Sequence, residues 1–425
     1  ILAYLEESNL FLIALDNRRE WYRYHHLFGE LLSHRLEQVA PAQIPRLHRL
    51  ASHWYQEHGF LEEAIDHALM GDDYEYAADL IEQVALEMGG QGRLTQLQQW
   101  IVSFPEIFLT ERPYLSITLA LKSILDMQVE QAEQHLALAE PRAYALTEDS
   151  VLKPEIMCQV ALLRGYISRL RGDIHASMSY LQQALHYFPE QQAVMRCSVY
   201  LNVGANYWIL GRFTEAEVSL QQAIALLHHP DTIYPALVAA GGLSNVYLQQ
   251  GRFNEVAKLH HEIEQQLPIP RRSHLAMNYV AVEQIPLSYE KNDLTAAAET
   301  IAKTIELGRK LDITINIGTV LLILAWIKHV AGQSDEIEVL LAQANTNRQP
   351  FVVEFDYYQV RLWLAMGNLE AASRWAQMYE QERQKAAPWQ ALLDLTHAHV
   401  LFAENQLERA IDTLRQCEEV AQSAG

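Results

Sequence analysis

The chain has 425 residues, half of them hydrophobic, and a formal net charge of −21. This acidic excess repels phosphate backbones, and no run of lysine or arginine offsets it, so composition gives no support to nucleic-acid binding by this stretch. The most apolar run, residues 313–330, is interrupted by Asn316, Gly318 and Lys328 and predicts a buried helix instead of a membrane span.

The first 36 residues do not follow the helical pattern of the rest. Residues 1–7 predict the end of a helix, and residues 9–14 and 21–24 predict two strands around a polar turn. A helix is then expected from His26 to Leu36. This order is typical of the closing part of a winged-helix module. Because the chain opens on Ile1 in mid-pattern, without an initiator Met or a signal peptide, we expect a piece of a longer protein.

The next segment predicts helices at less regular spacing. A first helical pair contains Trp54 and Ala68 and ends at residues 71–73. Further along the chain we expect a helix over residues 74–87, an odd pair over 100–118 and a helix over 128–139 that ends before Pro141. A seam between this segment and the more regular helices after it is expected at residues 89–92 or 141–154.

From residue 156 onward one short turn pattern recurs about every 40 residues. Its markers are Gly172, Gly211, Gly251, Asn292, Gly332, Gly367 and Asn405. Gly and Asn tolerate the left-handed conformation that ends a helix. A small residue usually follows five places later, at Ala216, Ala297, Ala372 and Ala410, where the second helix is expected to approach the first closely.

Each unit therefore predicts helix, tight turn, helix, with one apolar stripe on each helix. One such pair cannot bury its stripe alone, whereas a stack can. The predicted fold is all-α, a TPR-like α-solenoid (a right-handed superhelix of helical hairpins) preceded by the end of a winged-helix module. The expected domains are residues 1–40 for that module, 41–155 for an irregular helical adaptor and 156–425 for the repeat array.

Three motifs near the amino end carry a family resemblance. They are Trp-Tyr-Arg-Tyr-His-His-Leu-Phe at 21–28, Leu-His-Arg-Leu-Ala-Ser-His-Trp-Tyr at 47–55, and Gly-Phe-Leu-Glu-Glu-Ala-Ile-Asp-His-Ala-Leu at 59–69. The chain resembles the MalT-like large ATP-binding LuxR-type transcription regulators, which are signal-transducing ATPases with numerous domains. The resemblance is close over residues 5–85 and depends on architecture beyond them.

The resemblance implies a P-loop ATPase module before the winged helix, a repeat sensor after it and a DNA-binding helix-turn-helix at the end. This chain has no Gly-x-x-x-x-Gly-Lys-Ser/Thr motif and no basic recognition helix, so no cofactor is expected here. ATP or ADP with Mg is implied only for the missing module, and DNA only through the missing helix-turn-helix. Self-association is implied for the full-length protein.

His25 and His26 have two interpretations. In related ATPases a winged-helix histidine contacts the phosphates of bound ADP, and the resemblance implies that one of these two does so in the full-length protein. Alternatively, both histidines pack the ribbon against the following helix.

Catalysis finds little support, because no Gly-x-Ser-x-Gly, His-Glu-x-x-His or Cys-x-x-Cys motif occurs. The histidine clusters at 228–229, 260–261 and 397–399 point apart on helices and are interpreted as solvated or packed, not as metal ligands. Cys158, Cys197 and Cys417 are interpreted as reduced core thiols of a cytoplasmic protein. The chain is therefore predicted not to be an enzyme.

The first helix of each pair is expected to line the concave side of the superhelix. Inward positions should come about three, six and ten residues before each marker. They give the candidate ligand-binding residues Tyr166, Arg169, Trp208, Asn245, Tyr279, Glu283, Tyr289, Trp326, His329, Tyr357 and Arg361. Aromatic faces with a few carboxylate, amide and guanidinium groups suit a sugar, a nucleoside or another polar small ligand. The alternative is that each residue packs against the neighbouring unit.

The hypothesis is that the chain is the sensor and adaptor region of an ATP-dependent transcription activator. An inducer bound inside the superhelix would control oligomerisation and DNA binding of the full-length protein. The effector is expected to be a small molecule or a protein, without a membrane partner. The alternative hypothesis is a scaffold whose groove binds a protein or a peptide.

Overall fold

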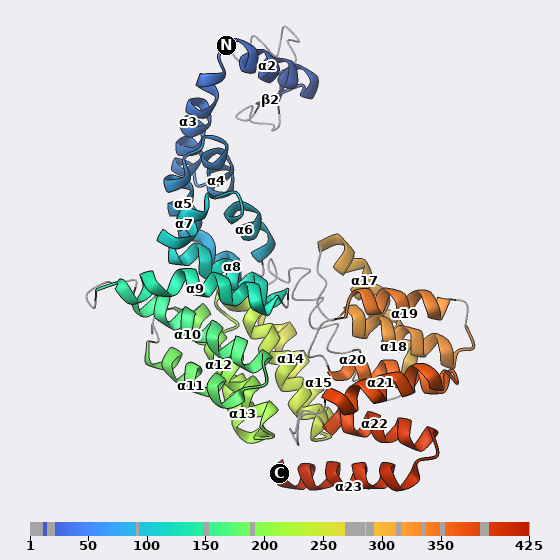
Figure 1. Cartoon of the computed structure of the whole chain (residues 1–425). Coiled ribbons are helices and arrows are strands. Elements are labelled where there is room, and N and C mark those ends of the chain that lie inside the picture. Colours follow the sequence, from blue (N-terminus) through green and yellow to red (C-terminus); the bar gives the residue numbers. More distant parts are fainter. Residues whose placement is uncertain are drawn as a thin grey trace. The chain divides into compact units, whose positions relative to one another are not determined.

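The computed structural model describes residues 12–14, 22–90, 93–126, 128–147, 153–187, 192–267, 285, 293–311, 317–333, 336–348, 353–382 and 391–424. Apart from one two-stranded sheet, the regular structure of these residues is helical, as predicted (Figure 1). The chain forms two compact units. The first unit contains residues 1–85 and 96–108, and the second contains residues 86–95 and 109–425.

The first unit begins with the predicted ribbon. Strand β1 (Leu12–Ala14) pairs antiparallel with β2 (Tyr22–Tyr24), and Leu12 lies opposite Tyr24. Helix α2 (His26–Val39) follows directly, and a short 3-10 turn, η1 (Pro41–Gln43), leads out of it. The order of two strands and a helix confirms the winged-helix pattern read from the sequence.

The rest of the first unit is helical. Its elements are α3 (Ile44–Glu57), α4 (Leu61–Met70), α5 (Tyr74–Gly90), α6 (Leu94–Ile101) and α7 (Glu106–Glu111), of which α5, α6 and α7 also reach into the second unit. Helices α3 and α4 form the predicted first pair, in which Ser52 Oγ donates to the Ala64 carbonyl at 2.6 Å. The odd pair expected over 100–118 is instead the end of α6, the short helix α7 and the start of α8.

The second unit is a succession of antiparallel helix pairs. The pairs are α8 (Pro113–Leu125) with α9 (Val129–Ala145), α10 (Lys153–Leu170) with α11 (Ile174–His186), α12 (Ala193–Ile209) with α13 (Phe213–Ile224), and α14 (Ile233–Gln249) with α15 (Phe253–Gln266). A 3-10 turn, η2 (Pro230–Thr232), precedes α14. Neighbouring pairs pack on one another, so that Cys197, Leu220, Leu243 and Val256 belong to one buried cluster.

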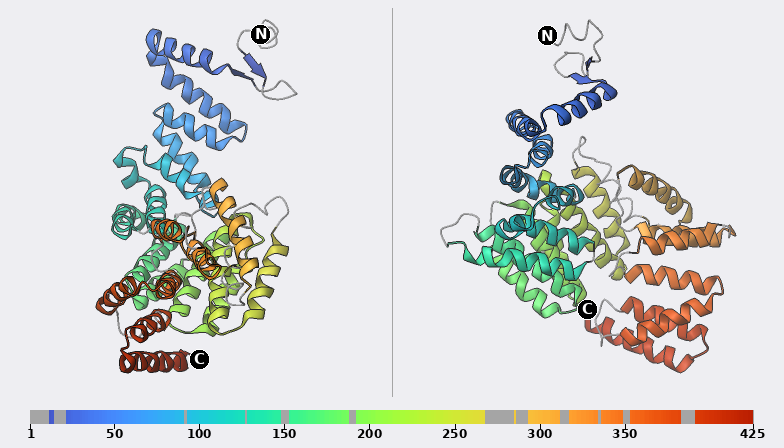
Figure 2. Two further views of the ribbon diagram at one scale, coloured as in Figure 1. Left: turned by 90° about the vertical axis from the view of Figure 1, so that its right-hand side faces the viewer. Right: turned by 45° about the horizontal axis from the view of Figure 1, so that its top comes forward.

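The later helices repeat this arrangement. They are α17 (Leu294–Leu311), α18 (Ile317–Val330) with α19 (Ile337–Thr346), α20 (Val353–Ala365) with α21 (Leu369–Glu382), and α22 (Ala391–Ala403) with α23 (Leu407–Ala424). Figure 2 shows these pairs following one another toward the carboxyl end. Residues 317–330 of the apolar run form the buried helix that was expected, α18, in which Leu322, Ile323 and Ala325 are fully buried, and residues 313–316 lie outside the described residues.

The predicted turn markers adopt the left-handed conformation. Positive φ angles of 62° to 80° occur at Gly172, Gly211, Gly251, Gly332, Gly367 and Asn405. The hydrogen bonds are those of a Schellman motif: Gly211 N–H donates to the Trp208 carbonyl at 3.0 Å, and Arg212 N–H to the Tyr207 carbonyl at 2.9 Å. The marker Asn292 lies outside the described residues.

Close approach of the two helices of a pair explains the small residues. Ala216, Ala297, Ala372 and Ala410 are buried, as expected. On the opposite helix of one pair, the Leu220 side chain lies so close to Gly204 that an added Cβ would be 2.6 Å from its Cγ. The spacing of small residues therefore indicates where the two helices of a pair pack closely.

Some boundaries differ from the sequence prediction. Helix α9 continues through Pro141 to Ala145, although Pro141 was expected to end it. Ala139 and Ala143 are fully buried on either side of the proline, and this packing offsets the loss of one backbone hydrogen bond. Helix α5 likewise runs on to Gly90. Among the described helices, none combines the length and the hydropathy needed to cross a membrane.

Candidate ligand-binding surface

The first helices of successive pairs contact one another and form a layer. In the second unit α8, α10, α12 and α14 pack in this order, and so do α18, α20 and α22. We call these helices the first-helix layer. All described candidates of the repeat array lie on it, because the turn markers set a common register for every pair.

The first group on this layer is the Arg169 cluster, which contains Tyr166, Arg169, Asn202, Asn206 and Tyr234. The Arg169 guanidinium lies 4.3 Å from the centre of the Tyr166 ring. Its Nη1 donates to the Asn202 carbonyl at 3.3 Å and to Asn206 Oδ1 at 3.4 Å. Asn206 Nδ2 in turn donates to Ser177 Oγ at 2.7 Å, so this network joins α10, α11 and α12.

Burial changes the ionisation of this cluster. Desolvation lowers the pKa of Arg169, although a guanidinium remains charged at neutral pH. Desolvation, with a smaller contribution from Tyr166, raises the pKa of Tyr234 to about 12. The Tyr234 hydroxyl is therefore a neutral hydrogen-bonding group at physiological pH. Sequence reasoning missed Asn202, Asn206 and Tyr234, which lie outside the three positions of the register that it used.

Trp208 lies on α12 and Asn245 lies on α14. The Trp208 side chain packs against the core formed by α12 to α15, and its Nε1–H donates to Gln249 Oε1 at 3.1 Å. Both side chains are half-buried. Trp208 therefore contacts the neighbouring pair but is only half-buried. Both interpretations of this residue, ligand binding and packing between units, stay open.

The second group is the Arg361 cluster, which contains Trp326, His329, Tyr357, Arg361 and His399. The Arg361 guanidinium lies 5.3 Å from the Trp326 ring centre and 5.0 Å from the Tyr357 ring centre. Its Nη1 donates to the Tyr357 hydroxyl. The Trp326 and His329 rings are 6.2 Å apart between centres. Four predicted residues from α18 and α20 thus meet at one place.

His399 on α22 extends this cluster. Desolvation, together with the positive charge of Arg361, lowers the pKa of His399. His399 stands six residues before the marker Asn405, as Arg361 does before Gly367, so the register could have identified it. Three further candidates, Tyr279, Glu283 and Tyr289, lie outside the described residues.

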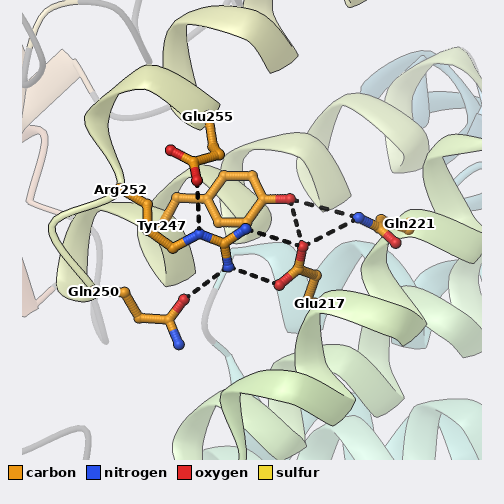
Figure 3. Close-up of polar contacts among 6 residues, drawn as sticks. All are labelled: Glu217, Gln221, Tyr247, Gln250, Arg252 and Glu255. Carbon is orange, nitrogen blue, oxygen red and sulfur yellow. Dashed lines mark hydrogen bonds and ion pairs between the residues drawn. The ribbon is translucent and has the colours of Figure 1, made fainter.

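A further polar network joins two pairs of the array (Figure 3). Glu217 of α13 accepts from the Tyr247 hydroxyl at 2.8 Å and from Arg252 Nη1 at 2.8 Å. Arg252 also pairs with Glu255 at 3.2 Å, and its guanidinium lies 4.2 Å from the Tyr247 ring centre. The hydrogen bond from Arg252 holds the pKa of Glu217 below its usual value. This network has all its charges paired and holds neighbouring pairs in register.

A hollow of about 200 Å³ lies between α9, α10 and α11. Tyr144, Tyr180, Tyr187 and Arg164 contribute to its lining. Arg164 Nε donates to Glu140 at 2.7 Å, so its charge is compensated within the protein. In the part of the chain that the structure describes, no three His, Cys, Asp or Glu side chains are grouped in a way that could hold a metal ion.

The candidate nucleotide-sensing residues His25 and His26 lie directly after strand β2. His25 precedes α2 and makes no side-chain capping hydrogen bond, and its ring centre is 4.5 Å from that of His26. His25 is half-buried and His26 is exposed. Cys158 and Cys197 are buried as expected, whereas Cys417 is only half-buried.

Comparison with known proteins finds a family match for the first 44 residues and for residues 158–425. The sequence pattern of the MalT-like TPR region matches residues 158–425, and that of the MalT winged helix domain matches residues 1–44. The HTH-type transcriptional regulator MalT of Yersinia pestis is 25% identical over 252 residues, which are 59% of this chain and 28% of that protein. The serine/threonine-protein kinase PknK of Mycobacterium tuberculosis is 34% identical over 125 residues, 29% of this chain and 11% of the kinase. The chain thus spans a small part of these relatives.

Solved structures share the fold. NprR in complex with its cognate peptide NprX superposes with a TM-score of 0.52 at 13% identity, over 85% of this chain and 97% of NprR. A signal transduction ATPase with numerous domains and a tetratricopeptide repeat sensor, from Pyrococcus horikoshii, gives 0.51 at 14% identity, over 99% of this chain and 58% of that one. Both likenesses support a TPR-like solenoid.

Proposed function

The chain belongs to the MalT-like family, and from this premise we propose that it is the ligand-sensing region of an ATP-dependent transcription regulator. Its sensor is the first-helix layer of the repeat array, and its ligand is a small-molecule inducer. The observation that carries the proposal is the convergence of Trp326, His329, Tyr357 and Arg361 at one place on α18 and α20.

Such a group suits recognition of a small polar ligand. Aromatic faces give contact area at low entropic cost, and guanidinium and imidazole groups orient polar atoms of a ligand. The members of the Arg361 cluster are half-buried or exposed, so a ligand can reach them. The side chains come from three consecutive first helices, and a ligand bound among them would favour one arrangement of these helices over another.

Binding would act on the full-length protein through differential affinity. A ligand that binds the active arrangement tenfold more tightly shifts the equilibrium by about 1.4 kcal/mol. The expected outcome is a shift from an ADP-bound resting form toward an ATP-bound oligomer that holds DNA. In that full-length protein, His25 or His26 would donate to a nucleotide phosphate, which His25→Ala and His26→Ala variants would test by their ADP affinity.

The proposal is tested by screening the purified chain against small metabolites by thermal shift and then by calorimetry. We expect a ligand with a Kd below 1 mM whose binding is lost in Trp326→Ala and Tyr357→Ala. Tyr144→Ala, an exposed aromatic on α9, is the matched control and should bind normally. Failure of every ligand to bind more tightly than 1 mM would refute the proposal.

A peptide effector is the second candidate, because the NprR structure with the same fold holds a cognate peptide. A peptide that lies along the first-helix layer would depend on both the Arg169 cluster and the Arg361 cluster. Binding that weakens in both Arg169→Gln and Arg361→Gln would favour the peptide, whereas a small molecule should depend on one cluster only.

A further inference from the structure

Many of the described arginines of the second unit pair with a carboxylate within 4.0 Å. These pairs are Arg142–Glu111, Arg164–Glu140, Arg171–Glu133, Arg212–Glu215, Arg252–Glu217, Arg348–Asp356, Arg374–Glu370, Arg409–Glu380 and Arg415–Asp412. Arg169 and Arg361, both on the first-helix layer, contact aromatic rings and neutral polar atoms instead.

This difference is informative because the sequence has 53 acidic residues against 32 lysines and arginines. In such a chain a half-buried arginine would readily find a carboxylate, since pairing lowers the cost of removing the charge from water. Within the described residues, no carboxylate lies within 4.0 Å of the Arg361 guanidinium. Among these residues, its contacts are with the Trp326 and Tyr357 rings and the Tyr357 hydroxyl.

The geometry around Arg361 prepares the guanidinium to bind an anion. It lies over the Trp326 ring and over the Tyr357 ring, and the described contacts include one hydrogen bond, from Nη1 to the Tyr357 hydroxyl. A guanidinium carries five N–H donors, so several remain for a bidentate contact with a planar anion.

The other titratable groups of the cluster also favour an anionic ligand. His329 on α18 and His399 on α22 are neutral or positive at any pH, so neither compensates Arg361. Burial, and to a smaller extent the charge of Arg361, lower the pKa of His399. A neutral imidazole can still donate one hydrogen bond to an anion.

We propose that the Arg361 cluster binds the anionic group of the ligand, a carboxylate or a phosphate joined to a flat or apolar ring. This inference rests on the proposed sensor function and adds the ligand's chemical class. The anion contacts Arg361 and the imidazole of His399, and the ring lies against Trp326 and Tyr357. The anion gives Arg361 a charged partner, which the described residues do not supply.

The test compares an acid with its neutral amide, and a carboxylate with a phosphate. Calorimetry or ligand-observed NMR measures binding of phenylacetate and its neutral amide, phenylacetamide, and of phenyl phosphate to the chain. We expect phenylacetate or phenyl phosphate to bind at least tenfold more tightly than phenylacetamide. The ratio of the two anions tells a carboxylate ligand from a phosphate ligand.

Variants then locate the site. Arg361→Gln should weaken binding of the better anion at least tenfold and leave the amide unchanged, and His399→Gln, an exposed position, should weaken it about threefold. Arg374 lies on α21, which is the second helix of its pair and is not part of the first-helix layer. Arg374→Gln removes the same charge and should leave the anion affinity unchanged. Thermal unfolding checks that each variant folds.

Two results would overturn the inference. One is equal binding of acid and amide to the unmodified chain. The other is unchanged anion affinity in both Arg361→Gln and His399→Gln. If a neutral inducer binds and depends on Trp326 while the anions do not bind, the sensor function stands and the anionic class is wrong. If nothing binds in either experiment, both fail.

Discussion

Two glycines that face the same leucine should respond to alanine in opposite directions. Gly204 on α12 and Gly242 on α14 are helical, and each lies next to Leu220 of α13. An added Cβ at Gly242 would be 3.5 and 3.6 Å from the Leu220 methyl carbons, an ordinary contact. At Gly204 it would be 2.6 Å from Cγ, 2.8 Å from Cδ2 and 3.3 Å from the backbone nitrogen of Leu220.

The magnitudes follow from these distances. Alanine in a helix interior is favoured over glycine by about 1 kcal/mol, so Gly242→Ala should stabilise the array by roughly that amount. The same gain applies at Gly204, but the buried Leu220, which is 1% exposed, would have to shift at Cγ, an atom close to its backbone. Overpacking of a core costs about 1–3 kcal/mol, so Gly204→Ala should be neutral to destabilising, and about 1–3 kcal/mol less stable than Gly242→Ala.

The assay must report locally, because long repeat arrays do not unfold in two states. Hydrogen exchange of the α12 and α13 amides is suitable, with thermal unfolding as a second measure. In a Leu220→Ala background the difference between the two glycine variants should shrink, since the contacts with Cγ and Cδ2 are gone and only the 3.3 Å approach to the backbone nitrogen remains. The reasoning is refuted if Gly204→Ala is as stable as Gly242→Ala with Leu220 present.

Three further predictions concern the turns, the core and the polar network. Gly211→Ala should destabilise the array by about 1–2 kcal/mol because φ at Gly211 is +71°, and Gly211→Asn should destabilise it by less. Thermal unfolding measures both losses of stability, and equal losses would contradict this prediction. Burial lowers the pKa of His260 to about 4, so the folded state keeps it neutral and stability should fall by up to about 3 kcal/mol as pH drops from 6.5 to 4. His260→Gln should remove that part of the pH dependence of stability, whereas His261→Gln, at the exposed neighbouring position, should keep it. If the pH dependence of stability is unchanged in both variants, His260 is not its source. Glu217→Gln should lower stability by about 1–2 kcal/mol because Arg252 loses a charged partner, and hydrogen exchange should rise at the start of α15; no change would mean that the network is not stabilising.

The sequence predicts the repeat because the physical requirement at each turn is local. A left-handed residue must end the first helix, and only Gly and Asn meet this at low cost, so the markers from Gly172 to Asn405 are visible without a structure. The same register predicts which residues share the first-helix layer, and it brings Trp326 and Arg361 together. Applied to the last pair, it would also have found His399.

Other features depend on packing that a single sequence does not display. The continuation of α9 through Pro141 depends on buried alanines around it, which outweigh the local cost of the proline. Asn206 contributes to the Arg169 cluster through a contact with another helix, and its position in the register does not suggest it. The lack of a carboxylate beside Arg361 among the described residues is a property of the assembled layer, because acidic residues are frequent along the whole chain.

The most direct measurement is a crystal structure of the chain with the tightest ligand that screening finds. The account predicts ligand density on the first-helix layer, against the Trp326 ring and within hydrogen-bonding distance of the Arg361 guanidinium. Density elsewhere, such as in the hollow between α9, α10 and α11, with the Arg361 cluster unchanged, would contradict it.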